Sequence, residues 1–294
     1  MDQAQRLREL VKANNSPKIS ARVITVTSGK GGVGKSSISL NLAIALTHEG
    51  NRVVIIDGDF GLANVEVMLG IHPTYNLSDL IYRNKSVTEI ITKGPEGIGF
   101  ISGGSGIQEM NDLTKDQITY MIKKLAQLDE LADIILIDTG AGITNSVLEF
   151  VAASSEVLLV TTPEPTSITD AYALLKTLNR RSDFNIKDIN IRMISNRVSS
   201  EEEGIDLYRK LNTVADRFLH LKMDYLGSVI QEANVSRAVM HQKPAIMLYP
   251  NMQFSKKIRT FAKVLCEKNN LQGEDRGGIA QLFSRLLLSR SKKN

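Results

Sequence analysis

Cysteine is almost absent from this sequence, which contains one, Cys266, in 294 residues. A single thiol excludes a disulfide framework and any site that needs several thiolate ligands, such as an iron–sulfur cluster or a zinc ribbon. Histidine is scarce too, and its four copies are scattered without the spacing of metal ligands. We therefore expect Cys266 to be a small buried residue of a helix and the histidines to be structural or exposed.

Long apolar runs are also missing. None approaches the roughly 20 residues that a membrane span needs, and the first residues, MDQAQRLREL, lack the apolar core of a signal peptide. No low-complexity block divides the chain, and its length and 42% hydrophobic content suffice for one large α/β domain. We expect a cytoplasmic protein unless a peripheral contact holds it on the inner face of a membrane.

What the sequence does contain is an alternation of strand and helix patterns. Several of the strand patterns are nearly continuous apolar runs, as in strands covered on both faces, and helical segments separate most of them. This predicts an α/β fold, a doubly wound and mainly parallel sheet with helices on both faces. The predicted strands are ARVITVT, RVVIIDGD, GIGFIS, ADIILIDTG, SEVLLVTT, INIRMIS and YLGSVI.

The loop after the first of these strands, TSGKGGVGKSS, satisfies G-x-x-x-x-G-K-[ST] and has a strand before it and a helix after it. Backbone N–H groups and the helix N-terminus bind phosphate oxygens in such a loop. We expect Lys35 to bridge the β- and γ-phosphates of a nucleotide, Ser36 to ligate Mg²⁺ and Ser37 to hydrogen-bond the α-phosphate. The predicted phosphate-binding set is Gly29, Lys30, Gly31, Gly32, Val33, Gly34, Lys35, Ser36 and Ser37.

Carboxylates follow two further strands of the predicted sheet. Asp138 ends the strand IILID and fits the acidic residue that holds Mg²⁺ through water in P-loop proteins. Asp57 and Asp59, in IIDGDFG, come at the end of another predicted strand. Because the carboxyl ends of parallel strands meet at one edge of a sheet, where ligands bind, we expect them to lie at the same edge as Asp138. One of these two can orient an attacking water. The residues predict a nucleotide hydrolase that uses ATP/ADP or a related nucleotide with Mg²⁺.

These motifs resemble those of a known family. KGGVGKS, with its extra lysine Lys30, is similar to the deviant Walker A motif of the MinD/ParA class of P-loop ATPases. IIDGDFGLAN resembles switch I of that class and IDTGAGI its switch II, and the similarity spans residues 20–268. The resemblance implies an ATP-sandwiched homodimer in which Lys30 reaches the partner's nucleotide. It also implies that Asp59 orients the water, that Asp57 and Gly142 belong to the switches, and that Asn196 reads the adenine edge.

The first residues carry a narrower resemblance. DQAQRLR is similar to the N-terminal activator motif of the FlhG family, MinD-like ATPases that govern flagellar number and placement. This implies that the segment stimulates the partner GTPase FlhF, with Gln3 central and Asp2, Ala4, Leu7 and Arg8 beside it. The family also implies contacts with flagellar switch-complex (C-ring) proteins. Taken alone, the segment is equally a polar helix at a frayed terminus.

The last residues predict an amphipathic helix. Ile279, Leu282, Phe283, Leu286 and Leu287 form one apolar stripe at helical spacing, and basic residues accompany it. The net charge of +4 suits an anionic surface, either lipid or nucleic acid. Two hypotheses stay open: the helix binds anionic membrane lipid weakly, with avidity in a dimer, or it packs on its own domain. Both hold if the helix is docked in a monomer and released on dimerisation.

We therefore divide the chain into an N-terminal activator helix with its linker (1–20), a MinD-like P-loop ATPase domain (21–269), and a linker with a C-terminal membrane-targeting helix (270–294). The leading hypothesis is a membrane-associating ATPase switch of flagellar assembly. The alternatives are a cell-division MinD, a ParA-type DNA-partitioning ATPase, and a metabolic ligase of the same fold that phosphorylates a small substrate. We expect no specific nucleic acid as a partner.

Overall fold

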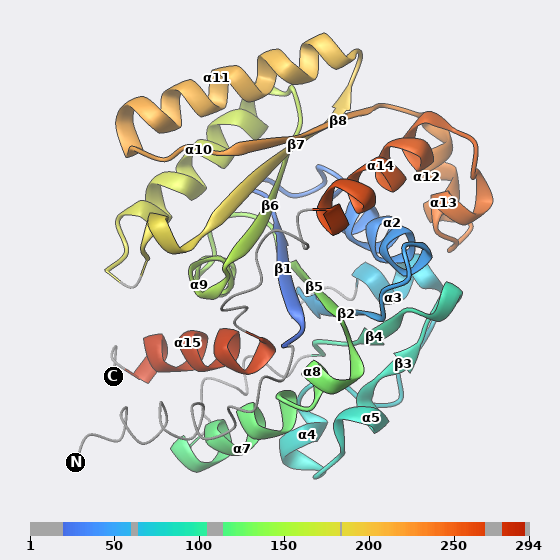
Figure 1. Ribbon diagram of the computed structural model, residues 1–294, viewed down its shortest axis with the longest axis vertical. Helices are drawn as coiled ribbons and strands as arrows, with labels where there is room; N and C mark the ends of the chain where they lie inside the picture. The colour runs from blue at the N-terminus through green and yellow to red at the C-terminus, as the bar shows by residue number, and fades with distance from the viewer. Residues whose placement is uncertain (1–19, 60–63, 105–113, 183, 268–277, 292–294) are drawn as a thin grey trace.

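The computed structural model describes residues 20–59, 64–104, 114–182, 184–267 and 278–291, and one sheet crosses its centre (Figure 1). Each predicted strand is present. A two-residue strand, β3, was not predicted, because so short a segment has no period to detect. The strands are β1 Arg22–Thr27, β2 Val53–Gly58, β3 Thr92–Lys93, β4 Gly99–Ile101, β5 Ile134–Thr139, β6 Glu156–Thr161, β7 Asn190–Val198 and β8 Asp224–Ile230.

Within the described residues the strands form an eight-stranded sheet of order β3-β4-β2-β5-β1-β6-β7-β8. Neighbouring strands are parallel except β3, which runs antiparallel to β4 at the edge. The chain winds outward from the central β1 in both directions, so the prediction of a doubly wound, mainly parallel sheet is confirmed. The carboxyl ends of β2, β5 and β1 lie next to one another, which is where such sheets bind ligands.

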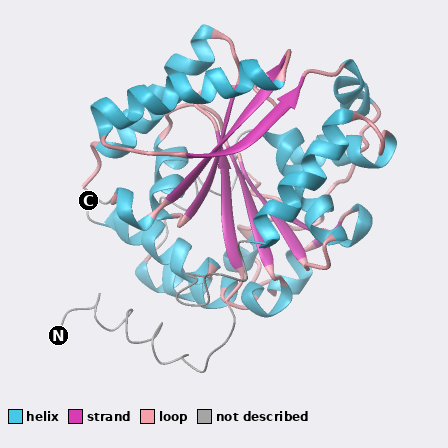
Figure 2. Cartoon of the chain, turned by 45° about the horizontal axis from the view of Figure 1, so that its top comes forward, coloured by secondary structure: helices cyan, strands magenta, loops and turns pink. Residues whose placement is uncertain are grey.

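Helices cover both faces of this sheet (Figure 2). Successive strand side chains point to opposite faces, so Ile24 and Val26 of β1 pack into one apolar cluster while Val23 packs into the other. The first face carries α2 Lys35–His48, α3 Asn64–Leu69, α12 Ala233–Met240, α13 Ala245–Leu248 and α14 Gln253–Glu267. The other carries α4 Asp79–Tyr82, α5 Val87–Ile90, α7 Lys115–Leu125, α8 Leu128–Leu131, α9 Asn145–Ala153, α10 Pro165–Asn179, α11 Glu201–Leu219 and α15 Ile279–Ser291.

Helix α15 packs against α7, α9 and the start of β1 (Figure 1). Its apolar stripe is covered: Ile279, Leu282, Phe283 and Leu286 are all at most 3% exposed. The ring of Phe283 meets that of Phe150 edge-on, with centroids 6.1 Å apart. The structure therefore has this helix in the docked arrangement, and the side chain of Leu287 lies outside the described residues. No helix in the described ranges is long and apolar enough to cross a membrane.

One carboxylate joins the residue before β1 to the first residue of α15. Asp129 Oδ1 accepts hydrogen bonds from the backbone N–H of Ala21, just before β1, at 3.2 Å and from that of Ile279, the first residue of α15, at 3.3 Å. A Cβ added to Gly278 would lie 2.4 Å from Asp129 Oδ2. The start of α15 is thus fitted to this side chain, which holds it next to the residue that leads into β1.

Candidate functional site

The phosphate-binding loop follows β1 and leads directly into α2. Gly32 and Gly34 adopt left-handed backbone conformations, with φ of +76° and +92°, which glycine adopts at low cost. No side chain in the described part of the chain caps the start of α2. The first N–H groups of that helix, at its positive dipole end, are therefore available to an anion, as the sequence predicted.

Gly29 serves the loop in a second way that the motif did not reveal. A Cβ at this position would lie 2.2 Å from the backbone carbon of Asp170 in α10. Only glycine permits this close approach, so Gly29 fixes the distance between the loop and α10.

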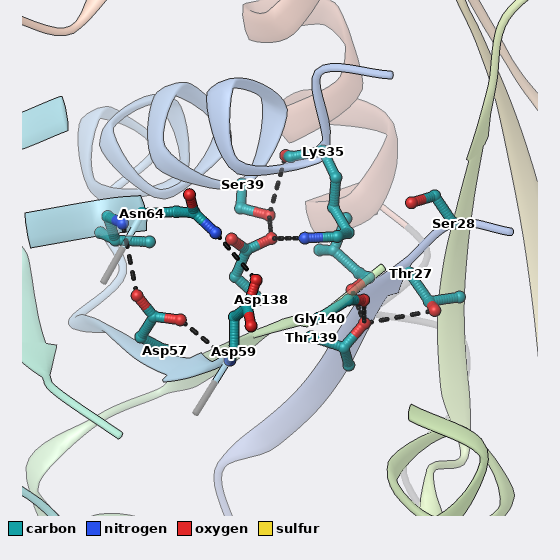
Figure 3. A network of polar contacts seen from close by, with 12 residues as sticks. Thr27, Ser28, Lys35, Ser39, Asp57, Asp59, Asn64, Asp138, Thr139 and Gly140 are labelled. Carbon is teal, nitrogen blue, oxygen red and sulfur yellow. Dashed lines mark hydrogen bonds and ion pairs between the residues drawn. The ribbon is translucent and has the colours of Figure 1, made fainter. Parts of the chain in front are cut away.

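Lys35, Ser39 and Asp138 meet at the base of the loop (Figure 3). Lys35 Nζ lies 3.3 Å from Asp138 Oδ1, and Ser39 Oγ donates to the same oxygen at 2.8 Å. Asp138 is fully buried, and its other oxygen, Oδ2, has no hydrogen-bond partner among the described residues. Because a buried carboxylate oxygen without a partner is costly, this atom fits a ligand that donates to it, such as the hydration shell of Mg²⁺.

Asp57 and Asp59 continue the acidic edge from the neighbouring strand. Asp57 accepts hydrogen bonds from the backbone N–H groups of Asp59, at 3.0 Å, and Val65, at 3.3 Å. Asp57 pairs with Asp138 across β2 and β5. Burial, and then the charge of Asp138, raise the pKa of Asp57 to about 7. These carboxylates concentrate negative charge where a divalent cation would be favoured.

Asn64 is a site residue that sequence reasoning missed. Its side-chain amide donates to Asp59 Oδ2 at 2.8 Å and so fixes the orientation of this carboxylate (Figure 3). The opposite oxygen, Oδ1, lies beside Gly140, where an added Cβ would be 3.4 Å away. Asn64 opens α3 five residues after Asp59, a spacing that carries no signal of its own.

The two other predicted nucleotide contacts also lie at this edge. The N–H of Gly142, at φ +85°, donates to the carbonyl of Ser28 at 3.1 Å and so joins the loop after β5 to the end of β1. Asn196 is buried at the end of β7, and its amide donates to the carbonyl of Val33 at 2.6 Å. It therefore contacts the phosphate-binding loop itself.

Lys30 is held on its own chain in this structure. Its ammonium lies 2.6 Å from Glu164 Oε2 and 2.7 Å from Thr166 Oγ1, at the start of α10. The Lys30 side chain is 34% exposed and that of Glu164 54%. Lys30 also lowers the pKa of Glu164. No sequence pattern predicts this pairing, which joins residues 134 positions apart.

The predicted residues thus separate into three groups. The phosphate, metal and switch residues from Gly29 to Asn196 converge on the carboxyl ends of β1, β2, β5 and β7. The stripe of α15 lies elsewhere, beside the start of β1. The predicted activator residues Asp2, Gln3, Ala4, Leu7 and Arg8 lie outside the described residues.

Comparison with known proteins agrees with this geometry. A family model described as "ParA: NUBPL iron-transfer P-loop NTPase" matches residues 20–266. The antiactivator FleN of Pseudomonas aeruginosa is 38% identical, with 90% of this chain and 93% of FleN covered. The flagellum site-determining protein YlxH of Helicobacter pylori is 34% identical, with 97% and 98% covered.

Among solved structures, the septum site-determining protein MinD of Pyrococcus horikoshii OT3, complexed with Mg-ADP, is similar in fold. It aligns with a TM-score of 0.65 at 21% identity and covers 85% of this chain and 98% of its own.

Proposed function

The chain belongs to the ParA/MinD family of P-loop ATPases, together with its relatives FleN and YlxH, and from this premise we propose that it is an ATP-driven switch that regulates flagellar number and placement. The single structural observation that carries the ATP site is the convergence at one sheet edge of Lys35 with two groups that have no partner among the described residues, the α2 N-terminus and Asp138 Oδ2. The flagellar role follows from the similarity to FleN and YlxH. Iron transfer is disfavoured, because Cys266 alone cannot supply the ligands of a cluster.

The phosphates of ATP fit the loop from Gly29 to Ser37. Its backbone N–H groups and the start of α2 offer donors, and Lys35 supplies a cation that now rests 3.3 Å from Asp138. Ser36 and Asp138 are the residues that would hold Mg²⁺, Asp138 through water. Bound there, Mg²⁺ supplies charge neutralisation for the phosphate oxygens. We assign Asn196 to the adenine edge by resemblance, and its amide now donates to the carbonyl of Val33 in the loop.

Hydrolysis needs a positioned water more than it needs covalent chemistry from the protein. Asp59 is the residue we assign to orient that water. The amide of Asn64 holds one Asp59 oxygen, so the other is the oxygen that remains to accept from water. Asp57 anchors the same loop through the N–H groups of Asp59 and Val65 and so keeps Asp59 near Gly140.

Dimerisation is the proposed role of Lys30. In an isologous ATP dimer, Lys30 of each subunit would reach the partner's nucleotide and stabilise the charge that develops there. The ammonium must first leave Glu164 and Thr166. Because both side chains of this ion pair are partly exposed, water can replace the interaction at small cost.

The tails complete the proposal. Residues 1–20 form the activator segment that stimulates the GTPase FlhF, and residues 270–294 carry the membrane helix, around the ATPase domain of residues 21–269. Since the stripe of α15 is buried here, lipid binding requires its release, which we couple to the ATP dimer. Two released helices on one dimer gain avidity for anionic lipid, so attachment to the cytoplasmic face of the membrane reports the nucleotide state.

The test measures GTP turnover by purified FlhF with a peptide of residues 1–16, and with the Gln3→Ala peptide as the control. Stimulation that the control peptide loses supports the flagellar assignment, and no stimulation of an active FlhF refutes it. In parallel, Lys35→Ala should abolish ATP binding, and Asp59→Ala should trap an ATP dimer by light scattering. ATP-dependent, salt-sensitive binding to any DNA duplex would favour the ParA alternative instead.

A further inference from the structure

The two oxygens of Asp138 have different surroundings, and this difference draws attention to Ser39. Oδ1 receives the Ser39 hydroxyl at 2.8 Å and lies 3.3 Å from the Lys35 ammonium. Oδ2 is buried without a partner among the described residues. Figure 3 displays Ser39 and Lys35 converging on Asp138 from α2. Together they leave Oδ2 as the atom that has acceptor capacity to spare.

Ser39 occupies the position one helical turn after Lys35, so both side chains lie on the same face of α2. It is fully buried. Its Oγ also lies 3.1 Å from the carbonyl of Lys35, the usual acceptor for a serine within a helix. The hydroxyl has one proton, and a carboxylate is the stronger acceptor at the shorter distance, so the bond to Asp138 is favoured.

We propose that Ser39 is a positioning residue for ATP hydrolysis, which fixes Asp138 through Oδ1 so that Oδ2 is presented to the water shell of Mg²⁺. The inference rests on the proposed function, in which Asp138 serves the metal. Lys35 cannot hold Asp138 Oδ1 during the reaction, because its ammonium then binds the phosphates. Ser39 is the donor that stays.

Two physical features favour a hydroxyl for this task. A neutral donor leaves the negative charge of Asp138 available to the cation, whereas a second lysine would compete with the metal. Asp138 also pairs with Asp57 across the sheet, and two carboxylates at such close quarters repel each other. A carboxylate under this repulsion needs an anchor to keep one orientation.

The experiment uses the full chain and measures ATP turnover against Mg²⁺ concentration at saturating ATP, for wild type, Ser39→Ala and Ser39→Thr. Thr47→Ala is the matched control, because Thr47 lies in the same helix and its hydroxyl donates to the carbonyl of Ala43. Among the described residues it bonds no carboxylate. Binding of a fluorescent ATP analogue in EDTA is measured in parallel. This second measurement gives the affinity that the loop and Lys35 provide for the nucleotide when no metal is bound.

We expect Ser39→Ala to raise the Mg²⁺ concentration for half-maximal turnover about tenfold, the size of effect usual for a hydrogen bond to a charged group. Metal-free nucleotide affinity should stay within twofold of wild type, Ser39→Thr should restore the Mg²⁺ response, and Thr47→Ala should leave it unchanged.

An unchanged Mg²⁺ response in folded Ser39→Ala would overturn the inference, and so would an equal loss of metal-free nucleotide affinity. If Ser39→Ala does not fold, Ser39→Cys, a weaker donor of similar size, must still raise the Mg²⁺ requirement above that of wild type, and an unchanged requirement would overturn the inference. A wild-type protein whose turnover ignores Mg²⁺ would instead overturn the proposed function itself. The two failures are therefore distinct.

Discussion

Replacing Phe150 by alanine should release α15 without changing α15 itself. Phe150 lies in α9, is fully buried and meets Phe283 edge-on at 6.1 Å. Truncating a buried phenylalanine costs about 3–5 kcal/mol, of which an edge-to-face pair accounts for about 0.5–1.5 kcal/mol. Part of this loss falls on the packing of α9 in the body, so we expect the free energy of opening α15 to fall by about 1–3 kcal/mol.

Hydrogen exchange of nucleotide-free protein measures that change directly. A loss of about 1–3 kcal/mol corresponds to exchange that is roughly 5- to 150-fold faster in peptides from α15. Phe261→Ala is the matched control, because Phe261 is equally buried but belongs to the cluster on the opposite face of the sheet. The reasoning is refuted if both variants lose similar thermal stability and α15 exchanges at the wild-type rate in each.

The same pair of rings separates docking from membrane binding. Phe150→Ala leaves the apolar stripe of α15 intact, so its binding to anionic vesicles without ATP should rise. Phe283→Ala also undocks the helix but removes the largest apolar group that would enter the bilayer, so its binding should stay low. Vesicle sedimentation compares the two, and equal binding would mean that docking does not control attachment.

Three further outcomes follow from the site and its surroundings. Burial and the charge of Asp138 raise the pKa of Asp57 to about 7, so the native state binds a proton more tightly than the unfolded chain. The free energy of unfolding without nucleotide, measured in urea, should therefore fall by about 1 kcal/mol from pH 6 to pH 8. Asp57→Asn should remove that slope, and a slope that persists assigns it to another group. Glu164→Gln removes the anion that holds Lys30, so the ATP dimer should tighten a few-fold in sedimentation experiments, whereas a weaker dimer would mean that Glu164 itself contacts the partner. Asp129→Ala removes the acceptor for the N–H groups of Ala21 and Ile279, so the docking free energy of α15 should weaken by about 1 kcal/mol. Hydrogen exchange at the first turn of α15 should then be faster, and unchanged exchange there would contradict this account.

The sheet and the phosphate loop were predictable because their signals are local. Buried parallel strands are apolar along their whole length, and the glycines and lysines of the loop are contiguous. Asp57 and Asp138 could be brought together from sequence, since both end strands of one parallel sheet. Asn64 and Ser39 could not, because an amide or a hydroxyl in a helix has many uses and no characteristic spacing.

Contacts between distant segments could not be predicted from the sequence for a different reason. An amphipathic stripe indicates that one face of α15 is buried but does not identify the surface that buries it, so both lipid and α9 were consistent with it. Lys30 presents the same difficulty: its motif implies a partner in another subunit, yet in this structure its ammonium rests on Glu164 of its own chain. The periodicity of a segment identifies its buried face and leaves its neighbour unspecified.

The shared acceptor Asp129 also couples two segments that are far apart in the sequence. The N–H groups of Ala21 and Ile279 lie within about 6.5 Å of each other, because both reach the same oxygen. Undocking of α15, which we propose for lipid binding, would break the Ile279 bond at the oxygen that also holds Ala21, so the change would reach the segment that leads into β1.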